Sequence, residues 1–235
     1  MDTRSALRAA IRLAAVSAGV AAATYAAMAA LAWHRYGRVR HANADEVDPL
    51  LDRFMPVFDV VERHHVRIAA PASITFAAAE EQDLFDLPLV RAIFRARELA
   101  LGATSEPHAH PRGLMTQIRE LGWGILADGP GHEVVVGAVT KPWEANPTFR
   151  ALQPDEFAAF RDPGYVKIAW TLRADAISPS ASVFRTETRA AATDAIARAR
   201  FRRYWAFASP GIGMIRRLSL LPLKHEAERR ARDRS

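Results

Sequence analysis

The uncharged run from Leu13 to Trp33 most constrains what this 235-residue chain can fold into. A helix over this run is about 31 Å long at about 1.5 Å per residue, which matches the hydrocarbon thickness of a bilayer. Trp33 stands where an interfacial aromatic ring is usual. Basic side chains flank the run on both sides: Arg4, Arg8 and Arg12 before it, and His34, Arg35, Arg38 and Arg40 after it. We therefore expect a single-pass N-terminal membrane anchor.

Two alternatives for this run remain open. One is a cleaved signal peptide, with Ala30-Leu31-Ala32 as a small-x-small cleavage site. The other is a soluble helix, because the run is rich in alanine, which contributes little to insertion. Basic residues directly after the run disfavour cleavage and export. Lys and Arg are balanced on the two sides, so the domain could face either side of the membrane, with a slight lean to the cytoplasm.

We expect four parts: a membrane segment with basic flanks over 1–40, a linker over 41–56, one folded domain over 57–228 and a basic tail over 229–235. A composition that is 50% hydrophobic and 25% charged is ordinary for a globular chain. The absence of cysteine excludes disulfides, thiolate metal sites and a cysteine nucleophile. The net charge is +6, but the arginines form no single basic block with interleaved aromatics, so no nucleic-acid partner is expected.

Residues 60–69 have the period-two pattern of a strand, and the charged residues Arg63, His65 and Arg67 share one face. The other face, with Glu62 and His64, is therefore predicted to point inward. Helices are predicted over 73–81, 89–101 and 114–121, the second ending at Gly102. Strands are predicted over 123–127, 133–140, 165–175 and 182–190, with Arg185, Glu187 and Arg189 of the last one facing outward.

The last helix is predicted to start after Asp194 as its N-cap and to bend near Pro210. Its apolar stripe consists of Ala197, Phe201, Tyr204, Trp205, Ala208, Ile212 and Ile215, and the opposite side carries Arg198, Arg202, Arg203, Arg216 and Arg217. A curved antiparallel sheet needs an apolar element on its concave side, and this helix is long enough. We expect an α+β fold in which the sheet wraps around the C-terminal helix and leaves a cavity between them.

Several segments in this order of elements carry a family resemblance. They are Glu133-Val-Val-Val-Gly137, Lys141-Pro-Trp143, Asp162-Pro-Gly-Tyr165 with Lys167 and Trp170, Thr186-Glu-Thr188, Ala192-Thr-Asp194, Phe201-Arg-Arg-Tyr-Trp205 and Pro210-Gly-Ile-Gly-Met-Ile-Arg-Arg217. These segments and their order resemble the helix-grip fold of the START-like superfamily, also called SRPBCC, which includes polyketide cyclase–dehydrase proteins and lipid-transfer domains. They resemble bacterial members of unassigned function, over roughly 57–228. The resemblance implies a ligand cavity, but the superfamily contains binders, transporters and enzymes, so it does not select a reaction.

Glu62 and His64 are the polar candidates for this cavity, because a carboxylate or imidazole in an apolar site can act as acid, base or ligand anchor. The full set of predicted pocket residues is Glu62, His64, Trp123, Val135, Trp170, Phe184, Thr186, Thr188, Phe201 and Trp205. His108-Ala-His110 with His132 and Glu133 lacks the fixed ligand spacing of a zinc site, so no metal is expected. No phosphate loop or G-x-S-x-G motif is present, and no cofactor is expected.

The sequence therefore favours a membrane-tethered module that binds an apolar or amphipathic small molecule, such as a lipid, in the predicted cavity. One alternative is an enzyme of cyclase or dehydratase type with His64 or Glu62 as the acid/base group. A third is an interaction or scaffold domain with a filled core. The presence of a cavity, and the direction in which Glu62 and His64 point, distinguish these hypotheses.

Overall fold

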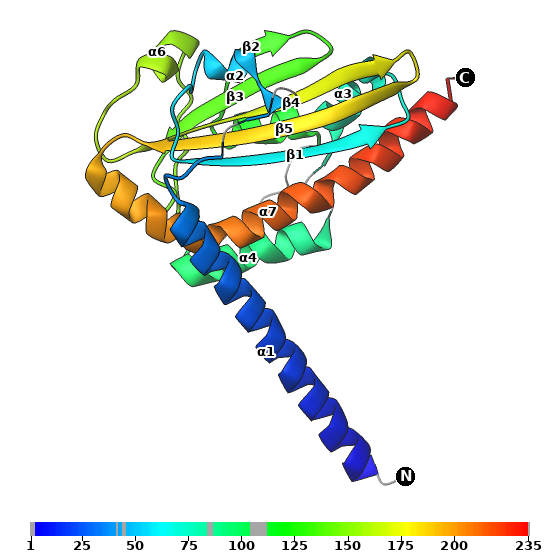
Figure 1. The fold of residues 1–235 in the computed structure, drawn as a ribbon, viewed down its shortest axis with the longest axis vertical. Coiled ribbons are helices and arrows are strands. Elements are labelled where there is room, and N and C mark those ends of the chain that lie inside the picture. The colour runs from blue at the N-terminus through cyan, green and yellow to red at the C-terminus, as the bar shows by residue number, and fades with distance from the viewer. Residues whose placement is uncertain (1–2, 41, 44–45, 84–86, 104–111, 235) are drawn as a thin grey trace.

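A computed structural model describes residues 3–40, 42–43, 46–83, 87–103 and 112–234, with side chains described from Ile11 onward. It confirms the α+β class: a five-stranded antiparallel sheet with the order β1-β5-β4-β3-β2 lies against a long C-terminal helix (Figure 1). The strands are β1 (Val60–Ile68), β2 (Gly124–Gly129), β3 (Glu133–Thr140), β4 (Val166–Ser178) and β5 (Ala181–Ala192). The helices are α1 (Thr3–Arg35), α2 (Pro49–Asp52), α3 (Ala72–Glu81), α4 (Pro88–Leu101), α5 (Leu114–Glu120), α6 (Pro154–Ala159) and α7 (Ala195–Arg232).

The register between β1 and β5 decides which side chains face α7. Glu62 lies opposite Thr188, and His64 lies opposite Thr186. Both threonine hydroxyls accept hydrogen bonds from Arg216 of α7, at 3.2 Å for Thr186 and 2.8 Å for Thr188. Side chains alternate along a strand, so this side of the sheet also receives Glu62 and His64, as the sequence predicted.

Helix α7 begins at the predicted cap. The Asp194 carboxylate accepts hydrogen bonds from the backbone N–H groups of Ile196 and Ala197, at 2.7 and 2.8 Å. The helix is continuous to Arg232, but Figure 1 shows it changing direction where α1 crosses it. Pro210 lies inside the helix, and its missing N–H removes one helical hydrogen bond, which explains a bend in this region.

The main core lies between the sheet and α3, α5 and α7. Its largest buried members are Ile68, Phe76, Ile118, Trp170, Leu172, Phe184 and Leu223. Leu223 and Ala227 extend this packing to the last turns of α7. The C-terminal part of α7 therefore belongs to the folded unit.

The opposite face of the sheet is covered, although its charged residues suggested exposure to solvent. Glu187 and Arg189 do face away from α7, but they are 5% and 3% exposed. Arg189 donates to the Glu187 carboxylate at 2.7 Å and to the Met55 carbonyl at 2.8 Å, and Arg63 binds Glu187 at 2.9 Å. The segment around α2, with Leu51 fully buried, lies over this network. The sequence predicted correctly that Glu187 and Arg189 point away from α7, but the expectation that they are exposed to solvent was wrong. A local charge pattern does not show which distant segment of the chain covers these side chains.

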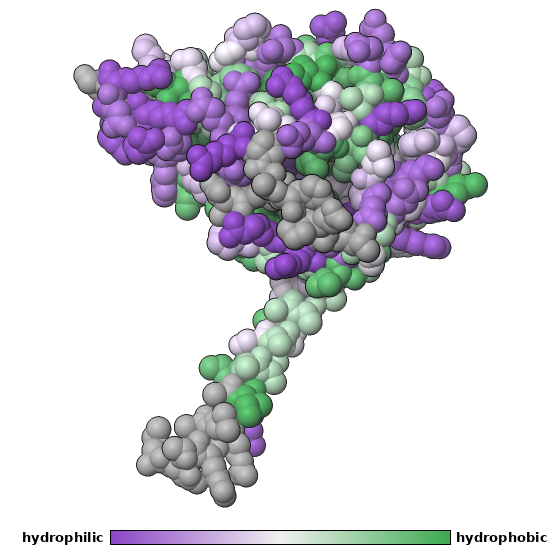
Figure 2. Space-filling model, turned by 180° about the vertical axis from the view of Figure 1, so that it is seen from behind, coloured by the Kyte–Doolittle hydropathy of each residue, from purple (hydrophilic) through white to green (hydrophobic). Residues whose placement is uncertain are grey.

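The N-terminal apolar run forms one helix, and its stretch Ile11–Arg35 is long and apolar enough to span a membrane. Figure 2 shows α1 leaving the domain as a largely apolar stalk, while the domain surface on this side is mostly hydrophilic. The last turns of α1 pack on α7. The Tyr25 hydroxyl donates to the Phe207 carbonyl, and the Arg202 guanidinium lies 4.2 Å from the centre of the Trp33 ring. The stalk is therefore fixed to the bend of α7.

Candidate functional site

A cavity of about 200 Å³ lies between the sheet and α7. Trp170 of β4 and Phe184 and Thr186 of β5 form its sheet side. Period-two alternation places Trp170 with Leu172, and Phe184 with Thr186, on the same face. The remaining lining comes from Trp123 and from α3, α4, α5 and α7, chiefly Ala79, Phe94, Leu114, Ile118, Ile212, Ile215, Ser219, Leu220 and Leu223. The wall is mainly apolar, as is usual for a small-molecule site.

Arg216 places a guanidinium in this apolar wall. Its Nη1 and Nη2 atoms donate to the hydroxyls of Thr186 and Thr188, and its Cζ atom lies 5.0 Å from the centre of the Trp170 ring. Burial lowers the pKa of Arg216 to about 10, and the charge of Glu62 partly opposes this shift. The cavity thus combines a broad apolar surface with one desolvated cation.

The sequence interpretation assigned Arg216 to the outward, arginine-rich side of the last helix, and that assignment was wrong. After the bend at Pro210, the residue one helical turn beyond Ile212 is Arg216, and one further turn reaches Leu220. Both of those neighbours line the cavity. This spacing, together with Thr186 and Thr188 on the inward face of one strand, was the sequence signal that could have placed Arg216 in the cavity wall.

Glu62 and His64 form a pair on the β1 edge of the same face. His64 Nε2 lies 3.4 Å from Glu62 Oε2, and the two side chains are 9% and 30% exposed. Within the described part of the chain, His64 Nε2 is buried and makes no hydrogen bond of good geometry. A buried imidazole beside a partly exposed carboxylate can pass a proton between them and a bound molecule.

The predicted pocket residues do not all line one space, and neither Glu62 nor His64 lines the cavity under α7: His64 borders a small space with Thr186 and Glu187. Trp123, Trp170, Phe184 and Thr186 lie in the cavity wall, and Thr188 holds Arg216 there. Glu62 and Trp205 line a second space, a groove beside α1. Phe201 packs between Tyr36 and Trp205, with ring centres 5.9 and 5.8 Å away.

Val135 faces the other side of the sheet, where it packs in the cluster of Phe157 and Leu51, and its assignment to the cavity is corrected. Strand β3 is buried along its whole length, so its sequence contains no polar–apolar alternation from which the facing could be read.

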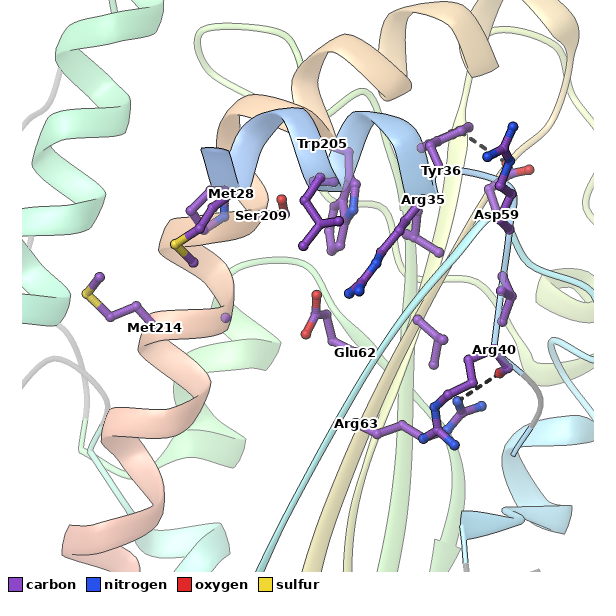
Figure 3. Close-up of a pocket in the computed structure, with 18 of the residues that line it drawn as sticks. Met28, Arg35, Tyr36, Arg40, Asp59, Glu62, Arg63, Trp205, Ser209 and Met214 are labelled. Atoms are coloured by element: carbon purple, nitrogen blue, oxygen red, sulfur yellow. Dashed lines mark hydrogen bonds between the residues drawn. The ribbon is translucent and has the colours of Figure 1, made fainter. Parts of the chain in front are cut away.

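The groove beside α1 is larger, about 990 Å³, and lies between the end of α1, the edge strand β1 and α7 (Figure 3). Its wall includes five arginines, Arg35, Arg38, Arg40, Arg63 and Arg217, against two carboxylates, Asp59 and Glu62. Apolar side chains of α1 and α7 complete it, chiefly Met28, Leu31, Trp205, Met214 and Leu218. Sequence reasoning missed this groove, because it exists only where α1 packs back on α7.

The described residues contain no group of three or more His, Cys, Asp or Glu side chains that could hold a metal ion. His108 and His110, weighed as metal ligands from the sequence, lie outside the described residues. His132 and Glu133 are adjacent in the turn and first residue of β3, but they face a different part of the molecule from the cavity.

No family model matches the chain, and no curated protein matches it significantly. Two solved structures show distant similarity. The di-domain aromatase/cyclase BexL from the BE-7585A biosynthetic pathway is 14% identical with a TM-score of 0.27, over 72% of this chain and 46% of that one. The ZhuI aromatase/cyclase from Streptomyces sp. R1128 is 15% identical with a TM-score of 0.22, over 73% and 94%. The chain thus spans about half the length of BexL.

Proposed function

We propose that this chain is a membrane-tethered, START-like helix-grip protein that binds an amphipathic small molecule in the cavity under α7. The observation that carries the proposal is Arg216, a desolvated guanidinium in a mainly apolar wall. In this scheme 1–40 is the membrane segment, 57–228 the binding domain and 229–235 a basic tail, and the connection 41–56 packs on the sheet through Leu51 and Met55.

Arg216 suits a ligand with an anionic or carbonyl end. A guanidinium has five N–H donors, and the two threonine hydroxyls accept from two of its nitrogens. Charge-assisted hydrogen bonds to a carboxylate or phosphate are about twice as strong as neutral ones, and they are stronger where water is excluded. The ligand's polar end would meet Arg216 while its apolar part contacts Trp123, Trp170 and Phe184.

The cavity volume limits the ligand. Sites for drug-sized molecules usually measure about 300–1,000 Å³, and this cavity measures about 200 Å³. We therefore expect a compact ligand, or one end of a longer chain that leaves between α4 and α7. The apolar stretch Ile11–Arg35 of α1 serves as the single-pass anchor. The most apolar part of this stretch is not buried against the domain.

A cyclase- or dehydratase-type reaction is the second candidate, and the His64–Glu62 contact of 3.4 Å favours it. An enzyme of this kind needs two acid/base groups within reach of one substrate. Glu62 and His64 are close to one another and face the Arg216 side of the sheet. An interaction or scaffold domain was expected to have a filled core, so the cavity under α7 counts against that alternative.

The binding proposal is tested with the full chain in detergent-free amphipol and a dansyl-labelled fatty acid. Trp123 and Trp170 in the cavity wall would transfer excitation energy to a bound dansyl group. We expect saturable energy transfer that weakens at least tenfold in Ile215→Phe, which reduces the cavity volume, and stays unchanged in the exposed control Ile196→Phe. A chain that takes up no probe, or an Ile215→Phe variant that binds as tightly as the wild type, would refute it.

A further inference from the structure

We propose that the groove beside α1 binds the phosphate headgroup of an anionic membrane phospholipid, with an acyl chain against its apolar end. This site is separate from the cavity under α7, and the inference rests on the membrane-anchor part of the proposed function. Four observations carry it: where the groove lies along α1, the order of its apolar and basic side chains, the pairing of its charges and its size.

The groove lies at the depth where headgroups are expected. Its α1 wall runs from Met28 through Leu31 and Ala32 to Arg35. The uncharged run ends at Trp33, so this wall extends from the edge of the hydrocarbon into the headgroup layer if α1 spans a bilayer. Met28 and Arg35 are about 10 Å apart along the helix axis, at about 1.5 Å per residue.

The apolar side chains lie at one end of the groove and the basic side chains at the other, so the groove matches a lipid with its acyl chain at the first end and its phosphate at the second. Figure 3 shows Met28 and Met214 at one end and Arg40 and Arg63 at the other, with Arg35 reaching into the space between them. Met214 and Leu218 of α7 are 42% and 36% exposed, so they offer an uncovered apolar wall opposite α1. The volume of about 990 Å³ can hold a headgroup and part of a chain.

Three of the five arginines, Arg35, Arg38 and Arg217, have no carboxylate contact among the residues that the structure describes. Arg40 binds Glu46 at 2.6 Å, Arg63 binds Glu187 at 2.9 Å, and Arg38 contacts His34 at 2.8 Å. Arg35 and Arg217, by contrast, have no ion pair with any residue that the structure describes.

One of the two carboxylates of the groove, Asp59, is already engaged. Asp59 accepts from the Tyr36 hydroxyl and pairs with Arg198 at 3.1 Å, and Glu62 lies beside His64. A guanidinium that lacks a carboxylate partner is well suited to a phosphate, which it binds through two parallel hydrogen bonds. The charge in the groove therefore selects an anionic headgroup over a zwitterionic one.

The charge test compares two double variants of equal net charge. Arg35→Gln/Arg217→Gln removes the two arginines of the groove that have neither an ion pair nor a side-chain hydrogen bond with the described residues. Arg203→Gln/Arg234→Gln removes two exposed arginines that do not line it. Each full-length protein is reconstituted in nanodiscs of phosphatidylcholine with or without phosphatidylglycerol, and native mass spectrometry counts the lipids that it retains.

The shape test fills the groove without disturbing the fold. Gly213 lines the groove, and a Cβ atom added there would meet nothing within 4 Å, so Gly213→Phe places a ring in the open space. Ala199→Phe, at an exposed position of the same helix, is the matched control.

We expect wild type to retain phosphatidylglycerol at least fivefold over phosphatidylcholine, and this preference to disappear in Arg35→Gln/Arg217→Gln and in Gly213→Phe but in neither control. Equal losses in the two double variants would show general surface attraction and overturn the proposal. Displacement of the lipid by millimolar inorganic phosphate would overturn it in favour of a free-phosphate site. Failure of the chain to float with vesicles would overturn the inference together with the membrane anchor.

The dansyl fatty acid assay keeps this result apart from the cavity proposal. Gly213→Phe that loses phosphatidylglycerol but still takes up the probe supports two separate sites. A wild-type chain that retains phosphatidylglycerol but takes up no probe supports the groove and refutes the cavity. A Gly213→Phe variant that loses the probe and keeps the lipid would overturn the assignment of the groove.

Discussion

Replacing Arg216 with methionine should weaken ligand binding strongly and stability little. The side chains have similar length, so the cavity keeps its shape. The lowering of the Arg216 pKa from its ordinary value to about 10 corresponds to about 3 kcal/mol of burial cost that a methionine at this position would not carry. Against this, the variant loses two hydrogen bonds to threonine hydroxyls and a ring contact with Trp170, together about 3–5 kcal/mol. The net loss of unfolding free energy should be at most about 2 kcal/mol.

Arg189→Met provides the contrast. Arg189 is 3% exposed and pairs with Glu187 and Asp52, so its removal leaves the buried Glu187 carboxylate with Arg63 as its remaining partner. Breaking a buried pair costs about 3–5 kcal/mol, and the Arg63 contact that remains places the expected loss at about 3 kcal/mol. Urea unfolding of the two variants, followed by circular dichroism at neutral pH, gives both numbers, with the exposed Arg203→Met as a control for the lost charge.

The binding side of this prediction uses the dansyl fatty acid and a matched dansyl fatty alcohol. Loss of one charge-assisted contact of about 2–3 kcal/mol weakens binding of the acid by about 30- to 150-fold. The alcohol should bind Arg216→Met within about threefold of wild type, because it forms no charge-assisted pair. An acid that binds Arg216→Met as tightly as wild type, or a destabilisation as large as that of Arg189→Met, would refute the role assigned to Arg216.

Two further predictions concern the opposite face of the sheet. Burial and the nearby Asp48 raise the pKa of Glu133 from 4.5 to about 7, so the native state holds this proton more tightly than the unfolded chain. Stability should therefore fall by roughly 1–3 kcal/mol between pH 4.5 and pH 7, with partial solvent screening included, and Glu133→Gln should flatten this part of the profile in urea titrations at pH 5 and pH 7.5. A profile that the substitution leaves unchanged would contradict the burial argument. Gly137→Ala would place a Cβ atom 2.5 Å from Leu126 Cδ1 and 3.0 Å from Phe157 Cε2. Thermal melting should therefore show a loss of about 1–3 kcal/mol of unfolding free energy. The control Gly131→Ala has open space around the new Cβ atom but a φ of 78°, and it should lose about 1 kcal/mol.

The elements that follow local rules could be predicted from the sequence. Asp194 caps α7, Gly102 ends α4 in the left-handed conformation, and alternation along β1 puts Glu62 and His64 on the α7 side. Each of these depends on a few neighbouring residues. The turn at Asp128-Gly129-Pro130-Gly131 likewise joins β2 to β3 as expected.

The rest depends on contacts between segments that are distant in the sequence. Val135 was assigned to the wrong face because the valines of β3 are buried on both sides. The covering of Glu187 and Arg189 by the α2 segment, and the groove between α1 and α7, arise only after the chain has packed. The sequence interpretation placed Arg216 on the wrong side of α7. It assigned the many arginines of this helix to one solvent-facing side, and the bend at Pro210 changes which residues face solvent beyond it.

Two desolvated arginines of this fold show why Arg216, and not Arg189, marks a binding site. Arg189 is compensated within the protein, since it contacts the carboxylates of Glu187 and Asp52 and the Met55 carbonyl. Arg216 contacts two hydroxyls and a ring, and no carboxylate of the described residues lies within ion-pair distance. The Glu62 carboxylate favours charged Arg216 from beyond that distance, but a desolvated charge without a contacting anion costs stability, and two threonines compensate it less well than an anion in contact would. Arg189 therefore has a structural role, whereas Arg216 gains its missing partner when an anionic ligand enters the cavity.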